Sequence, residues 1–180
     1  NAAKSFENEE LTKQTNYEGV MNLFNESLKN NVKKFVYTSS ASLYGPTSEI
    51  VTEEFECKPI SPYGKYKLMA ETEIMEKSKQ QGLDLTSLRL GTVHGWTIGM
   101  RFDTVIDRFV YLAVCGSGIP LWETAIKEKR PYLHVKDATR AFLFVTKDSN
   151  TKGQIYNVVS QNAALMEVVD EIKKYFPDVK

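Results

Sequence analysis

Short apolar runs alternate with helical segments along this chain, and this order constrains its fold more than any other feature. Strands that are joined through a helix run parallel, because the crossover returns the chain to the same end of the sheet. The sequence therefore predicts an α/β protein with a parallel sheet flanked by helices. Strands are predicted at residues 32–37, 83–90, 131–135 and 154–159, and helices at 1–30, 63–81, 101–115, 137–146 and 165–175.

Length and charge narrow the class of protein further. The 180 residues, of which 42% are hydrophobic, are enough for one domain with a substantial core. The net charge is zero and both signs are mixed along the chain, which favours neither nucleic acid nor a membrane as a partner. The longest apolar runs fall well short of the roughly 20 residues of a membrane span, and no signal peptide opens the chain, so we expect a cytoplasmic protein.

The cysteines point to no disulfide framework and no metal site. Cys57 and Cys115 lie far apart, and neither has a partner at the spacing of metal ligands. We therefore expect two thiols without a structural bond.

Small hydroxyl residues follow the first predicted strand. Thr38, Ser39 and Ser40 come directly after residues 32–37, as is typical of the carboxyl end of a parallel strand that faces a ligand. Right-handed crossovers would gather these serines, Tyr63 and residues 91–95 at one edge of the sheet.

A tyrosine and a lysine open the helix predicted after residue 61. Pro62 suits the first helical position, and Tyr63 and Lys67 are four residues apart, so they share one face. A nearby ammonium lowers the cost of deprotonating a phenol, which makes the pair a candidate acid/base device. A solvated pair with no chemical role would have the same spacing, so the pair alone does not decide between the two.

An ordered set of motifs resembles the extended short-chain dehydrogenase/reductase family, in its branch of NAD-dependent nucleotide-sugar epimerases and dehydratases. The motifs cover nearly the whole chain, and the resemblance implies a partial Rossmann-type sheet. Residues 1–95 would be the C-terminal half of the NAD-binding domain. Residues 96–180 would be mainly a smaller α/β substrate-binding region, with strands and helices that return to the core. The motifs are Asn16-Tyr-Glu-Gly19, the run Val36 to Gly45, Ser61-Pro-Tyr-Gly-Lys-Tyr-Lys67, Leu88 to Gly95, Arg130 to Asp137 and Gly153 to Val158.

The resemblance also implies roles for single residues. Tyr63 would exchange the proton of a sugar hydroxyl, Lys67 would bind the nicotinamide ribose and hold the phenolate, and Ser40 would hydrogen-bond the reacting oxygen. Ser39 and Asn16 would help to bind the cofactor, NAD, with NADP as an open alternative. Ser39 could instead satisfy the loop after its strand, and Asn16 could be a buried amide that bonds backbone.

Further candidates belong to the second half of the chain. In addition to Ser40, the substrate-binding candidates are Thr92, Arg101 and Arg130. The two arginines are candidates because a guanidinium matches the diphosphate of a nucleotide sugar. Arg130 could instead be a solvated member of the charged run 127–130. His94 and His134 are expected to be packing or hydrogen-bonded residues. Trp96 and Trp122 would stack on a base or pack in the substrate half.

Departures from the family leave several readings open. No Gly-x-x-Gly-x-x-Gly occurs, although in the family this loop cradles the cofactor pyrophosphate upstream of every matched motif, so we expect a fragment that binds NAD poorly. Ala41-Ser42 stands where dehydratases usually carry acidic residues, so an epimerase is favoured over a dehydratase or an NAD(P)-dependent reductase. A non-catalytic truncated relative is a further alternative. The family commonly dimerises through core helices, here residues 16–30 and 63–80.

Overall fold

A computed structural model describes residues 2–123 and 126–179. It forms two compact units, one of Asn1–Leu90 with Ala141–Val158 and one of Gly91–Arg140 with Val159–Lys180. The first unit thus runs to Leu90, and the segment from Ala141 to Val158 belongs to it as well. Each unit is described by itself.

The first unit contains a three-stranded parallel sheet in the order β1-β2-β5. Its strands are β1 (Lys34–Ser40), β2 (Asp84–Leu90) and β5 (Ile155–Val158). This sheet confirms the predicted Rossmann-type α/β fold. Strand β1 extends further than predicted, so Ser39 and Ser40 belong to the strand itself, and Ser40 is paired with Leu90 on β2.

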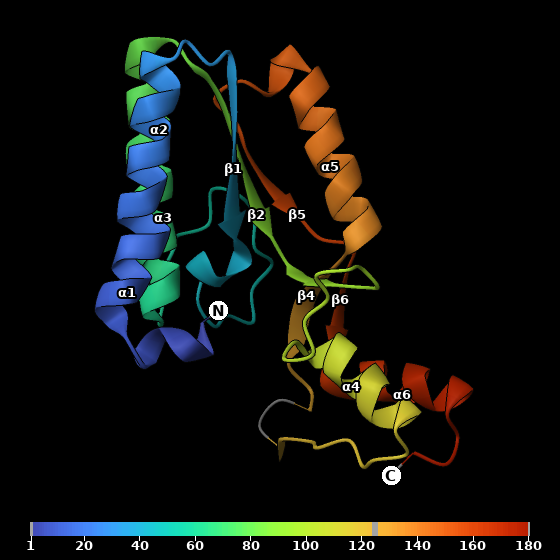
Figure 1. Cartoon of the computed structure of the whole chain (residues 1–180). Coiled ribbons are helices and arrows are strands. Elements are labelled where there is room, and N and C mark those ends of the chain that lie inside the picture. Colours follow the sequence, from blue (N-terminus) through green and yellow to red (C-terminus); the bar gives the residue numbers. More distant parts are fainter. Residues whose placement is uncertain (1, 124–125, 180) are drawn as a thin grey trace. The chain divides into compact units, whose positions relative to one another are not determined.

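Helices cover both faces of this sheet (Figure 1). Helices α2 (Gly19–Lys29) and α3 (Pro62–Gln81) lie side by side on one face, and the part of α5 (Val135–Lys147) from Ala141 onward lies on the other. The core under α2 and α3 comprises Met21, Phe24, Tyr37, Ala70, Ile74, Met75, Leu83 and Leu85.

The single helix predicted over residues 1–30 is wrong. The structure divides it into η1 (Ala3–Phe6), α1 (Glu9–Lys13), a π-helical turn η2 (Gln14–Glu18) and α2. The first break comes at Asn8, whose extended backbone leaves its side chain free to cap α1 by accepting a hydrogen bond from the Leu11 amide at 2.8 Å.

Helix α3 has the start and the end that its sequence predicts. The Ser61 hydroxyl accepts a hydrogen bond from the Gly64 amide at 3.1 Å, and Pro62 occupies the first turn. Gly82 ends the helix with a left-handed backbone, φ 75°. These two ends fix the register of the helix, and with it the positions of Tyr63 and Lys67.

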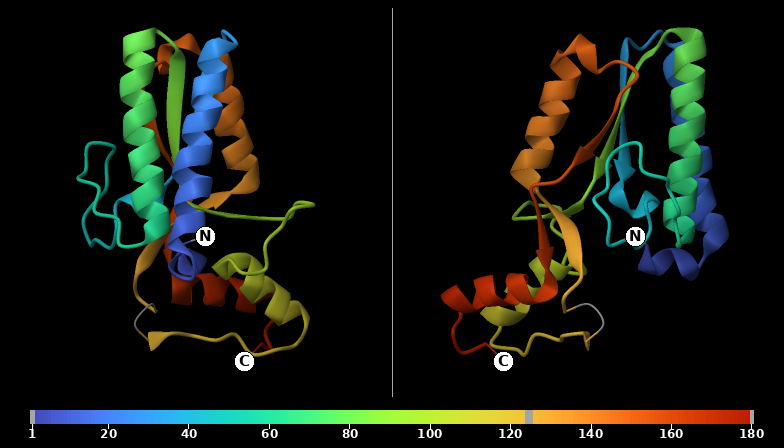
Figure 2. Two further views of the ribbon diagram at one scale, coloured as in Figure 1. Left: turned by 60° about the vertical axis from the view of Figure 1, so that its left-hand side comes forward. Right: turned by 180° about the vertical axis from the view of Figure 1, so that it is seen from behind.

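The second unit has its own sheet, in the order β3-β4-β6 (Figure 2). Strand β3 (Thr92–His94) is parallel to β4 (Lys129–His134), and β6 (Gln161–Ala164) is antiparallel to β4. Helices α4 (Val105–Val114) and α6 (Leu165–Tyr175) pack around Phe109, Tyr132 and Val169. Two short 3-10 turns within the described residues are η3 (Ala41–Leu43) and η5 (Ser149–Thr151).

Some elements of the second unit differ from the prediction. Strands β3 and β6 were not predicted as separate strands, because they are short and β6 begins with Gln161 and Asn162, which give no apolar period. Helix α4 begins at Val105 rather than at Arg101, because Thr104 has an extended backbone. Over residues 2–123 and 126–179, no helix is both long and apolar enough to cross a membrane.

Candidate active site

Lys67 is buried between α3 and β1. Its Nζ donates a hydrogen bond to the Thr38 carbonyl oxygen and lies 4.2 Å from the centroid of the Tyr37 ring, so a cation–π contact adds to the hydrogen bond. Burial lowers the pKa of Lys67 from 10.5 to about 8, and the Glu71 carboxylate acts in the opposite direction. Lys67 is therefore poised to change charge just above neutral pH.

Tyr63 stands one helical turn before Lys67 and is half-buried. Its neighbour Tyr37 has a pKa raised by burial, and the charges of Glu71 and Tyr63 raise it further. The Tyr37 hydroxyl donates to the Lys67 backbone carbonyl at 3.3 Å. Tyr37 thus stays protonated, which leaves Tyr63 as the candidate for proton exchange.

The first turn of α3 packs closely against the segment that follows Ser40. A Cβ on Gly64 would lie 3.0 Å from the Ser42 carbonyl oxygen and 2.9 Å from the Pro59 Cβ, so glycine permits this approach. The Ser40 hydroxyl lies 2.9 Å from the Ser42 hydroxyl and accepts a hydrogen bond from the Ser42 amide at 3.2 Å. The packing brings the start of the Tyr63 helix against the turn that begins at Ser40.

Ser39 and Asn16 have different surroundings. Ser39 is 2% exposed, and within the described part of the chain its Oγ has no hydrogen-bond partner. Asn16 is half-buried in the π-helical turn, and its amide donates to the Thr12 carbonyl at 2.9 Å, within its own helical segment. Ser39 is thus an unsatisfied polar group at the carboxyl end of β1, whereas the Asn16 amide bonds backbone.

The three substrate-binding candidates belong to the second unit. Thr92 is exposed on β3. Arg101 forms two hydrogen bonds to Asp103, at 2.9 and 2.6 Å, and Arg130 lies 3.4 Å from Glu128. Both arginines are exposed, so an anionic ligand would compete with an acidic side chain two residues away.

The histidines and tryptophans of the second unit also have defined neighbours. The His94 and His134 rings are 5.4 Å apart, and burial followed by the His134 charge lowers the pKa of His94. The His134 Nδ1 accepts a hydrogen bond from the Lys136 amide at 3.2 Å. Trp122 stacks on Phe109, whereas Trp96 is largely exposed.

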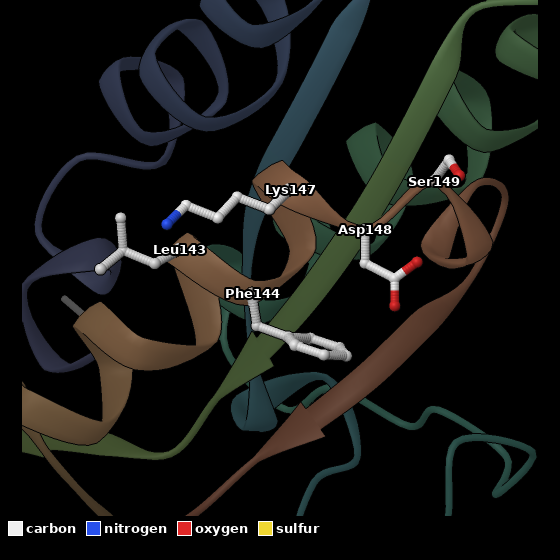
Figure 3. A pocket seen from close by; sticks show the side chains of 5 residues that line it. All are labelled: Leu143, Phe144, Lys147, Asp148 and Ser149. Atoms are coloured by element: carbon white, nitrogen blue, oxygen red, sulfur yellow. The ribbon is translucent and has the colours of Figure 1, made fainter.

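Two surface hollows, one in each unit, are lined by residues other than the candidate catalytic ones. A hollow of about 520 Å³ lies at the C-terminal end of α5, where Figure 3 shows its five side chains, Leu143, Phe144, Lys147, Asp148 and Ser149. An apolar hollow of about 480 Å³ in the second unit is lined by Trp96 and side chains of α4. Among the described residues, no group of three or more His, Cys, Asp or Glu could hold a metal ion.

The sequence analysis missed a buried ion pair next to Lys67. Glu71 on α3 and Arg89 on β2 are 2.6 Å apart and almost fully buried. Arg89 interrupts the apolar run of residues 83–90, and a charge inside such a run requires a buried partner. That interruption was the signal available in the sequence.

The fold and the site together define a class. A parallel β1-β2-β5 sheet with helices on both faces is a Rossmann-type α/β fold, and a tyrosine and a lysine one turn apart lie beside the carboxyl end of its first strand. Such a fold binds its ligands at the carboxyl ends of the strands. The class is therefore that of α/β proteins that bind a dinucleotide cofactor.

The chain belongs to the NAD dependent epimerase/dehydratase family, whose model matches residues 1–159. It is 27% identical over 176 residues to a UDP-glucose 4-epimerase of Lactobacillus helveticus, covering 88% of this chain and 53% of that protein. It is also 27% identical over 146 residues to a dTDP-glucose 4,6-dehydratase of Streptomyces griseus, covering 80% and 43%.

Among solved structures, MoeE5 in complex with UDP-glucose and NAD is similar, with a TM-score of 0.81 and 25% identity. The match covers 90% of this chain and 54% of MoeE5. The chain spans 38% of the length of the first curated relative it matches and 22% of the next. The family is NAD-dependent, so the predicted family and cofactor are confirmed.

Proposed function

We propose that the protein acts in the cytoplasm as an NAD-dependent epimerase of a nucleotide sugar, with Tyr63 as its acid/base residue. The observation that carries this proposal is the placement of Tyr63 one turn before a buried Lys67, whose ammonium is held by the Thr38 carbonyl. An ammonium fixed beside a phenol favours the phenolate, and this makes Tyr63 able to exchange protons near neutral pH.

The residues at the end of β1 suit the nicotinamide end of the cofactor. The buried Ser39 hydroxyl has no hydrogen-bond partner within the described residues. The Lys67 ammonium donates one hydrogen bond to the Thr38 carbonyl and has further N–H groups. Both groups can therefore hydrogen-bond a ribose or an amide of the cofactor. NAD supplies a reversible hydride acceptor when bound. Lys67, Ser39 and Asn16 are the residues we assign to holding it.

The chemistry of the chain's own residues follows from this arrangement. Tyr63 removes the proton from a sugar hydroxyl and later returns it, and the Lys67 charge stabilises the phenolate between these steps. Ser40 hydrogen-bonds the same oxygen and orients it toward Tyr63. Arg101 and Arg130, with Thr92, would bind the diphosphate and the sugar once the arginines leave their acidic neighbours.

An epimerase is favoured over a dehydratase by the residues after Ser40. Elimination of water needs a carboxylic acid and a base beside the reacting carbons, and Ala41 and Ser42 supply neither. The Ser42 hydroxyl bonds to Ser40 instead, at 2.9 Å. This set of residues supports proton and hydride exchange better than elimination.

The experiment is to incubate the intact protein with NAD and either UDP-glucose or dTDP-glucose, and to follow the sugar by NMR and NADH by absorbance. We expect a mixture of two epimers with no net NADH. Steady consumption of added NADH or NADPH would instead indicate a reductase, and loss of water a dehydratase. No turnover with any of these sugars and cofactors would contradict the enzymatic proposal and favour a non-catalytic relative.

We also propose that two copies pair through α2 and α3. Leu23 on α2 and Met69 on α3 are large apolar side chains that are 61% and 39% exposed, so both are available for a contact between copies. Light scattering of the intact protein tests this. A dimer that Leu23→Glu converts to a monomer supports the pairing, and a wild-type monomer excludes it.

A further inference from the structure

The ion pair between Glu71 and Arg89 fully satisfies a carboxylate inside the first unit. Arg89 Nε and Nη2 lie 2.9 and 2.6 Å from Glu71 Oε1, and the Ser87 hydroxyl donates to Glu71 Oε2 at 2.6 Å. Glu71 is 1% exposed and Arg89 is 5% exposed. The carboxylate therefore has a fixed position and no access to water.

The remaining guanidinium nitrogen of Arg89 forms hydrogen bonds outside the ion pair. Its Nη1 donates to the Tyr44 hydroxyl at 2.7 Å and to the Glu53 carbonyl at 3.1 Å. The Tyr44 hydroxyl donates to Asn157 Oδ1 at 2.7 Å, and the backbone N–H of Asn157 donates to the Glu53 carboxylate at 2.6 Å. Arg89 thus links α3, β2, β5 and the long segment between β1 and α3.

A buried ion pair of this kind is costly to form. The free-energy cost of removing two charges from water is offset only when the geometry is good and every other hydrogen bond is made. Apolar residues of similar volume often stabilise a fold to the same extent. Stability alone is therefore a weak reason for a charged pair here. Its position relative to Lys67 suggests a different reason.

Glu71 lies one helical turn after Lys67, on the same face of α3. The titratable and charged groups around the Lys67 ammonium are Tyr37 from β1, Tyr63 and Glu71 from its own helix, and Arg89 beyond Glu71. Only Glu71 among them carries a negative charge at neutral pH. It raises the pKa of Lys67 against the opposite effect of burial.

We propose that Glu71 is a positioning residue of the site: its carboxylate, held in place by Arg89, keeps the buried Lys67 ammonium charged beside Tyr63. Arg89 and Ser87 fix the carboxylate so that it acts on Lys67 from a constant distance. This inference rests on the role proposed above for Lys67.

The test is to titrate Lys67 directly by NMR of a ¹³Cε-labelled intact protein, without cofactor or substrate. The Lys67 signal is assigned as the one that Lys67→Arg removes. In the wild type we expect a pKa of about 8. In Glu71→Gln we expect it to fall below the wild-type value, because the Glu71 carboxylate that raises it has gone.

Glu73→Gln is the matched control on the same helix. The Glu73 carboxylate bonds to the Tyr17 hydroxyl at 2.5 Å and to Lys77 at 2.8 Å, away from Lys67. This variant removes the same charge two residues along the chain, and it should leave the Lys67 titration unchanged. A fall as large as in Glu71→Gln would overturn the proposal.

The double variant Glu71→Gln/Arg89→Gln controls for misfolding of the single variant, because it leaves neither charge of the buried pair without its partner. We expect the Lys67 pKa to fall less here than in Glu71→Gln, because loss of the Arg89 charge acts in the opposite direction, with an unchanged near-UV circular dichroism spectrum. An unchanged Lys67 titration in both Glu71 variants, or loss of the fold in both, would overturn the proposal. Because the titration requires no turnover, an inactive protein with the expected shifts would count against the proposed function alone.

Discussion

The Lys67 ammonium donates its hydrogen bond to the backbone carbonyl of Thr38, two residues before the end of β1. A backbone carbonyl has no alternative rotamer, so the strand holds the lysine more rigidly than a side chain could. The Tyr37 ring, 4.2 Å away, restricts it from a second side. Lys67 is therefore a cation in a fixed position beside β1.

Removal of the Tyr63 hydroxyl should abolish most of the activity. Tyr63→Phe keeps the ring but cannot exchange a proton, so we expect turnover to fall by about 10²- to 10⁴-fold with little change in NAD affinity. The control is Tyr66→Phe, on the same helix, whose hydroxyl bonds only to Glu9 among the contacts described, at 2.8 Å. Equal activity of Tyr63→Phe and the wild type would refute the assignment of Tyr63.

Activity should fall on the alkaline side because Lys67 loses its charge. Its pKa is lowered to about 8, so the ammonium is present below pH 8 and is lost as the pH rises through that value. We expect kcat to decline above pH 8. In Lys67→Arg this decline should move to higher pH, since a guanidinium does not titrate there. An identical alkaline limb in both proteins would exclude Lys67 as its cause.

Ser39→Ala should separate stability from cofactor binding. Without cofactor the variant removes a buried hydroxyl that has no partner within the described residues, so the free energy of unfolding should rise by up to about 1 kcal/mol. If the hydroxyl bonds NAD, affinity for NAD should fall in the same variant. Ser40→Ala, which loses contacts to Ser42, should be no more stable than the wild type. A Ser39→Ala protein that is less stable without NAD contradicts this account.

Alanine substitutions at Gly45 and Gly82 separate the cost of backbone strain from the cost of a steric clash. Both have a left-handed backbone, with φ of 73° and 75°. A Cβ on Gly82 meets no atom within 4 Å, whereas one on Gly45 would lie 2.2 Å from the Lys58 carbonyl oxygen. Gly82→Ala should cost about 1–2 kcal/mol of unfolding free energy from backbone strain, and Gly45→Ala clearly more. Chemical denaturation measures both, and equal losses would show that the segment from Gly45 to Lys58 adapts.

The parallel sheet and the Tyr63 helix could be predicted because their signals are local. Strands that alternate with helices fix a parallel sheet. Ser61 and Pro62 mark the start of α3, and Gly82 marks its end. The break at Asn8 has a local signal too, since asparagine is a good N-cap. The helical period of the flanking residues obscured it.

The buried polar network could not be predicted from local patterns. Glu71, Arg89 and Asn157 come from three elements, and their pairing depends on the sheet register that sets Arg89 opposite Asn157. The sequence shows only that a charge interrupts an apolar strand. The partners become evident once β5 is placed beside β2, although residues 91–154 separate these strands in the chain.

The chain crosses between its two units after Leu90, Arg140 and Val158. Consequently no single uninterrupted stretch of the gene encodes either unit, and truncation from one end removes part of both before it isolates one. To obtain the first unit alone, Leu90 would have to be joined to Ala141 by a new linker. Exchange of the second unit between relatives would likewise require new junctions at all three of these crossings.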